Sequence, residues 1–134
     1  FNNLRALLLA AVVAVFSFGA LALILLMIPL ALVGFFAVEV GLLGYNPWVF
    51  VLAFILPHGI VELPAAIIGT AFALRIGAAL VSPPKGLDVG QGFLLVLADF
   101  CKVFFFLVVP LLLVGAFIEA NLTPQIVLAL YSGR

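Results

Sequence analysis

The chain has 134 residues, of which 69% are hydrophobic and only 7% are charged, and its formal net charge is zero. A soluble domain carries roughly 25% charged residues, so this chain is too apolar to cover a surface that faces water. We therefore expect the lipid bilayer to be its solvent. Without a basic cluster, the chain lacks the electrostatic footprint of a nucleic-acid-binding protein, and we expect no nucleic acid as a partner.

The scarcity of cysteine and histidine limits the chemistry further. Cys101 is the only cysteine and His58 the only histidine, so neither an internal disulfide nor one of the usual zinc ligand sets can form within this chain. We expect no metal and no cofactor. Because the sequence begins at Phe1 rather than at methionine, we expect residues 1–134 to form a single transmembrane domain of a longer protein.

The first apolar stretch covers residues 6–43 almost without interruption. A membrane span needs about 20 residues, and Pro29 cannot donate to the hydrogen-bond ladder of a helix. The sequence therefore predicts a first helix over about 5–28 and a second over about 30–43. Residues 44–48, Gly-Tyr-Asn-Pro-Trp, combine turn formers with aromatic residues that favour the headgroup zone, so they predict an interfacial turn.

The next apolar run, residues 48–56, is too short to cross a membrane. It is either the first half of one kinked helix or a broken, re-entrant half-helix that ends at Pro57. Residues 60–81 follow as another span.

A polar loop over residues 82–91 leads to a last span over 92–118, which Pro110 is expected to kink. Residues 119–124 are expected to end that helix. The prediction is an all-α, polytopic transmembrane helix bundle of about four or five helices, one of them broken or re-entrant at Pro57.

Charged residues inside the apolar spans are the first candidates for a site. With a rise of about 1.5 Å per residue, Arg75 lies roughly 10 Å from the 82–91 loop on one arm of a hairpin, and Asp99 roughly 12 Å along the other. We predict that these two side chains pair. Asp99 and Lys102 stand at i and i+3, so they share a face and can pair as well. The alternative is that Arg75 and Lys102 only extend toward the headgroups.

Two acids lie toward the opposite end of the same hairpin. Glu62 is about 30 Å from the loop along its helix, and Glu119 is farther still along the other arm. We therefore expect Glu62 and Glu119 to gather near one interface.

The stretch around Glu62, PHGIVELP, is unusual in so apolar a chain. Pro57 suits the first turn of a helix, and His58 and Glu62 at i and i+4 are expected to share a face and to hydrogen-bond. Pro64 is expected to kink or restart the helix, and Gly59 to let another backbone approach closely. The pair is either a buried contact that fixes helix packing or a functional site: a proton relay, an ion-binding position or a partner-docking notch.

Enzyme motifs are missing from the sequence. It contains no HExxH metalloprotease motif and no G-x-S-x-G nucleophile motif. We expect a non-enzymatic protein with no catalytic residues.

Four stretches resemble the motifs of one known family. Residues 57–65, PHGIVELPA, are similar to a PHG-x-x-ELPA signature and are the most specific of the four. The others are FNNLR at 1–5, ALRIG at 73–77 and FIEANLTP at 117–124, and all occur in family order. The resemblance is to the stage II sporulation protein M family of integral membrane proteins. One departure is that the family tends to place Asn-Gly between its first two helices, where this chain has residues 29–34.

The resemblance implies a function that the residues alone do not. In spore-forming bacteria the family's founding member sits in the engulfing membrane with a peptidoglycan hydrolase and a scaffold, and it is thought to help localise cell-wall degradation. The resemblance thus implies a multi-pass cell-membrane protein that organises or recruits other membrane proteins, in a homo-oligomer or a hetero-complex. His58, Glu62, Arg75 and Glu119 are the polar positions that match, with no role assigned to them.

Two other functions stay open from the sequence. A permease-like transporter subunit is suggested by the helix break and by the intramembrane polar residues, which transporters use near the midplane. An accessory subunit of a respiratory or photosynthetic complex is suggested by the 14 phenylalanines, which could pack against pigment or lipid.

Overall fold

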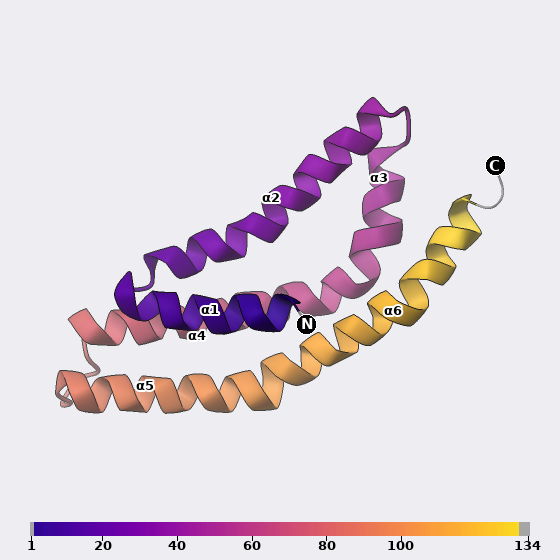
Figure 1. The fold of residues 1–134 in the computed structure, drawn as a ribbon. Helices are drawn as coiled ribbons and strands as arrows, with labels where there is room; N and C mark the ends of the chain where they lie inside the picture. The colour runs from indigo at the N-terminus through magenta and orange to yellow at the C-terminus, as the bar shows by residue number, and fades with distance from the viewer. Residues whose placement is uncertain (1, 132–134) are drawn as a thin grey trace.

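The computed structural model describes residues 2–131, which form four helical rods joined by short turns (Figure 1). No strand occurs among these residues, so the all-α prediction is confirmed. The first rod is α1 (Asn2–Phe16) and the second is α2 (Ala20–Leu42). The third joins α3 (Pro47–Phe50), the π-helix η1 (Val51–Ile55) and α4 (Leu56–Val81). The fourth joins α5 (Val89–Val103), the π-helix η2 (Phe104–Val108) and α6 (Val109–Tyr131).

Within residues 2–131, three helical segments are long and apolar enough to cross a membrane: Ala20–Leu42, Pro47–Val81 and Val89–Leu130. The helix over Asn3–Phe16 is apolar but shorter. In lipid every backbone polar group must be satisfied inside the protein, which helices achieve within themselves. The chain is therefore a helical membrane protein.

The turn between the first two rods lies at residues 17–19, so the predicted helix boundary at Pro29 is wrong. Phe18 and Gly19 both have positive φ, 51° and 94°. Ser17 Oγ donates to the carbonyl of Val13 at 2.8 Å and accepts from the N–H of Leu21 at 3.2 Å, so it supports the backbone on both sides of the turn. Pro29 lies inside α2, because the loss of one backbone donor does not end a long apolar helix.

The predicted turn is confirmed at residues 44–46, whereas Pro47 and Trp48 of the predicted range already belong to α3. Gly44 has a φ of 85°, and the Asn46 side chain accepts a hydrogen bond from the N–H of Trp48 at 2.9 Å, which caps the start of α3. From Pro47 to Val81 the rod is then continuous. The structure therefore favours one kinked helix, with its irregularity just before Pro57, over a separate re-entrant half-helix.

The third and fourth rods contain the same irregularity. The N–H of Leu56 bonds to the carbonyl of Val51, five residues back, and the N–H of Val109 bonds to that of Phe104 in the same way. One residue separates the end of each π-helix from a proline, which is Pro57 in the third rod and Pro110 in the fourth. π-bulges and prolines are recognised causes of helix kinks. Both rods bend in this region (Figure 1), and the kink expected at Pro110 is confirmed.

Two of the predicted boundaries in the second half of the chain need correction. The loop is shorter than residues 82–91, because Asp88 and Gln91 form a capping box that starts α5 at Val89. The last helix does not end at 119–124 but continues through Pro124 to Tyr131. Near that proline the Thr123 hydroxyl donates to the carbonyl of Ile118 at 3.4 Å.

The core lies where α1, α5, η2 and α6 pack against α4, and it combines small residues with larger ones such as Phe104 and Val108. Ala10, Ala14 and Ala73 are almost completely buried, together with the larger Ile76. A side chain at Gly77 would meet the backbone of the turn between α1 and α2, including the carbonyl oxygen of Ala14 at 2.6 Å. The close backbone approach therefore occurs at Gly77. At Gly59, where we expected it, the nearest atom is on Ile55 of the same rod.

Candidate functional site

The polar residues predicted from the sequence gather in two separate places. The first is an ion cluster on α4 and α5. Arg75 Nη2 lies 3.6 Å from Asp99 Oδ2, and Lys102 Nζ lies 3.9 Å from Asp99 Oδ1. Both predicted pairs are confirmed. The side chains of Arg75 and Lys102 are still 51% and 72% exposed, so pairing and extension toward the surface occur together.

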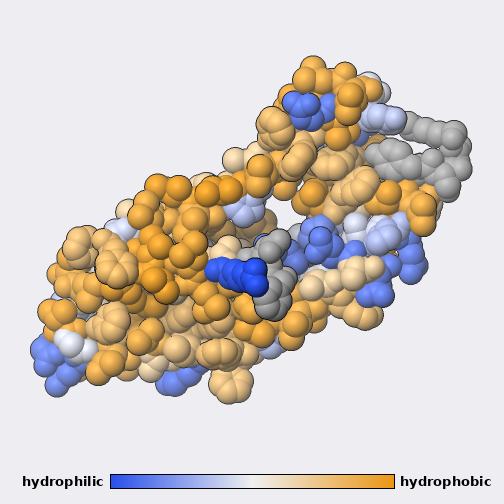
Figure 2. Space-filling view, viewed as in Figure 1, coloured by the Kyte–Doolittle hydropathy of each residue, from blue (hydrophilic) through white to orange (hydrophobic). Residues whose placement is uncertain are grey.

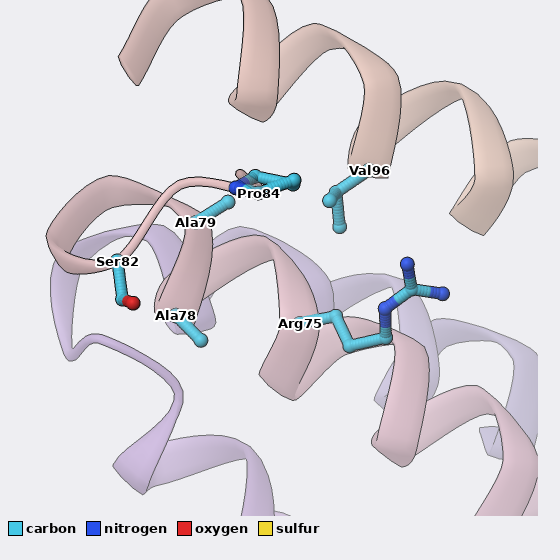
Figure 3. Close-up of a pocket in the computed structure, with 6 residues that line it drawn as sticks. All are labelled: Arg75, Ala78, Ala79, Ser82, Pro84 and Val96. Carbon is cyan, nitrogen blue, oxygen red and sulfur yellow. The ribbon is translucent and has the colours of Figure 1, made fainter. Parts of the chain in front are cut away.

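A small pocket lies beside the Arg75 side chain. Its volume is about 160 Å³, and Figure 3 shows Arg75, Ala78, Ala79, Ser82, Pro84 and Val96 around it. Small-molecule sites usually occupy about 300–1,000 Å³. We therefore interpret the ion cluster as a contact that joins α4 to α5 rather than as a binding site.

The second place is a cavity of about 850 Å³, which has walls from α1, α2, η1, α4 and α6. Figure 1 shows why it exists: α2 diverges from α1 and α4 after the first turn. Figure 2 shows an opening between α2 and the rest of the protein, with hydrophilic residues gathered along part of its edge. The polar side chains that line this cavity are Asn3, His58, Glu62, Thr70 and Glu119.

Glu62 of α4 and Glu119 of α6 line the same cavity, so the two acids gather as expected. Their place at a membrane interface stays a prediction. The Glu62 side chain lies directly against Gly115 of α6, so closely that a Cβ at that glycine would clash with it. Gly59 and Pro64 also line the cavity, whereas Pro57 does not. Pro64 lies inside α4 rather than restarting a helix.

The partner of Glu62 differs from the expected one. The Asn3 side-chain amide donates to Glu62 Oε2 at 2.6 Å, across 59 residues of sequence. No hydrogen bond joins His58 to Glu62 in the described part of the chain, and the Nδ1 atom of His58 is buried there without a partner. The packing of α1 against α4 brings the Asn3 amide to the carboxylate, which the spacing along α4 alone could not reveal.

The chemistry of this cavity follows from its lining. Two carboxylates, an imidazole and an amide stand among mostly apolar side chains. The described residues contain no group of three or more His, Cys, Asp or Glu side chains that could hold a metal ion. The arrangement is suited to accepting hydrogen bonds from a positively charged organic group.

Comparison with known proteins gives one result. The family described as Stage II sporulation protein M matches residues 1–124 of this chain. No curated protein and no solved structure was found to match. The matched region contains both the ion cluster and the cavity.

Proposed function

Because this chain belongs to the stage II sporulation protein M family, we propose that it is a non-enzymatic, multi-pass protein of the cell membrane that recruits or organises partner proteins. In a spore former, the family resemblance implies that the complex serves cell-wall degradation during engulfment. The observation that carries the proposal is the poor packing of α2 within its own chain.

Only Ala22 is buried among the 23 residues of α2. Large side chains such as Phe35, Phe36 and Val38 are more than half exposed. Lipid can cover such side chains, so exposure alone does not require a partner. The glycine in the middle of this helix gives the stronger argument.

A side chain at Gly34 would meet no other part of the protein within 4 Å. Glycine in a helix interior costs about 1 kcal/mol relative to alanine, and nothing in this chain's own packing requires it at that position. In membranes, small residues let a neighbouring helix approach closely. Gly34, Ala37 and Val38 stand at i, i+3 and i+4, so they form one face of α2 that suits a partner's helix.

The test is gentle purification from native membranes, with mass spectrometry of the proteins that remain bound. We expect a fixed, stoichiometric membrane partner with the unmodified protein, and at least a tenfold loss of it with Gly34→Leu. The matched control is Ala98→Leu, which enlarges an exposed small residue on α5 and should keep the partner. Recovery of the chain alone, or equal retention by both variants, would contradict the proposal.

The cavity favours a permease-like transporter subunit as a second candidate. Transporters place polar side chains near the midplane beside interrupted helices, and His58, Glu62 and Glu119 line the cavity next to η1. Recovery of an ATPase in the same purification would favour this function.

A further inference from the structure

The cavity has the size of a small-molecule site. Its volume of about 850 Å³ falls within the usual range of about 300–1,000 Å³.

The lining is polar on one side and apolar on the other. Asn3, Glu62 and Glu119 come from α1, α4 and α6. The opposite wall, on α2, is entirely apolar and consists of Leu25, Leu26, Pro29, Leu30 and Val33. A ligand that matches both sides has a polar head and an apolar tail.

The charged side chains that line the cavity indicate the charge of the ligand's headgroup. Apart from His58, the titratable side chains that line the cavity are the carboxylates of Glu62 and Glu119. None of the cationic side chains of the described residues is among those that line it. A headgroup that complements these two carboxylates carries a positive charge.

The absence of aromatic residues from this lining limits which kind of cationic headgroup the cavity can bind. No Phe, Tyr or Trp is among the residues that line the cavity, although the sequence holds 14 phenylalanines. Quaternary ammonium groups are recognised by aromatic cages, which this cavity does not have. A primary ammonium instead carries three N–H donors, and carboxylates accept such charge-assisted hydrogen bonds.

We propose that the cavity binds a membrane lipid whose headgroup carries a primary amine. The ammonium lies between Glu62 and Glu119, and the acyl chain lies along the apolar wall of α2. This inference goes beyond the proposed recruitment of partners, which uses the Gly34 face of α2. The two can fail separately.

The test offers the purified protein an equal mixture of phosphatidylethanolamine, phosphatidylcholine and phosphatidylglycerol with identical acyl chains, and counts the retained lipids by native mass spectrometry. Phosphatidylglycerol has the phosphate without the amine, and phosphatidylcholine has a cation without N–H donors. We expect about a tenfold preference for the amine lipid, the effect of one charge-assisted hydrogen bond. The double variant Glu62→Gln, Glu119→Gln should reduce this preference to about one.

Three further variants make the result decisive. Glu39→Gln removes an exposed carboxylate on α2 that does not line the cavity, so it should keep the preference. Val33→Trp fills the apolar side and should reduce retention of the amine lipid by a similar factor. If the double variant does not fold, the single variant Glu119→Gln replaces it, because Glu119 is exposed. This variant should also lower the preference for the amine lipid. Equal retention of the three lipids by the unmodified protein would overturn the proposal, as would a preference that survives the loss of the carboxylates.

Discussion

The two ends of α4 are packed in opposite ways. Toward Val81, α4 lies against α1 and α5 through glycine and alanine, and Gly77 touches the backbone of the neighbouring turn. Toward Leu56, α4 faces the cavity, and the opposite wall on α2 is made of leucine, valine and proline. In a membrane, lipid tails solvate large apolar side chains as well as a protein does, so helix association depends on close packing and polar contacts. The comparison shows that the close backbone approach occurs at small residues, whereas the cavity lies where α2 presents large ones.

The largest effect is expected from a substitution that enlarges the glycine at the packed end of α4. Gly77→Val places a side chain against the backbone atoms of Phe18 and Gly19, which cannot rotate away. We expect a loss of about 3 kcal/mol or more in the free energy of unfolding. The measurement is unfolding in detergent micelles followed by circular dichroism.

The matched control for that prediction is Gly34→Ala at the open end, where a side chain meets nothing within 4 Å. It should leave stability unchanged or raise it by up to about 1 kcal/mol, since alanine is the better helix former. Equal destabilisation by the two variants would refute the distinction between a packed and an open end.

A smaller effect is expected from the ion cluster at the packed end. Because Arg75 and Asp99 form an ion pair, the double variant Arg75→Ala, Asp99→Ala should cost about 0.5 kcal/mol less than the sum of the single variants. Lys102 also lies near Asp99, which limits the effect of losing Arg75. The same unfolding assay measures this coupling. Arg75→Ala combined with Glu39→Ala is the control and should be additive, and additivity in both pairs would argue against the contact.

Contacts that follow from regular helix geometry were predictable from the sequence. The pairing of Arg75 with Asp99 results from similar distances along a hairpin, and the same reasoning places Glu62 and Glu119 toward its other end. The kink before Pro110 follows from the chemistry of proline.

Features that depend on tertiary packing or on subtle turn chemistry were not predictable in this way. Pro29 was a stronger local signal than the Ser-Phe-Gly turn at 17–19, yet a long apolar helix tolerates a proline inside it. The Asn3 contact depends on how α1 packs against α4, and no spacing within one helix contains that information.

The central claim is that the Gly34 face of α2 is covered by another protein in the native membrane. Its most direct test is a photo-crosslinking residue at Val38, which shares that face and is 62% exposed, with the same residue at Leu94 on α5 as the control. We predict a protein adduct of one defined mass from position 38 and lipid adducts alone from position 94. Lipid adducts alone from both positions would contradict the account.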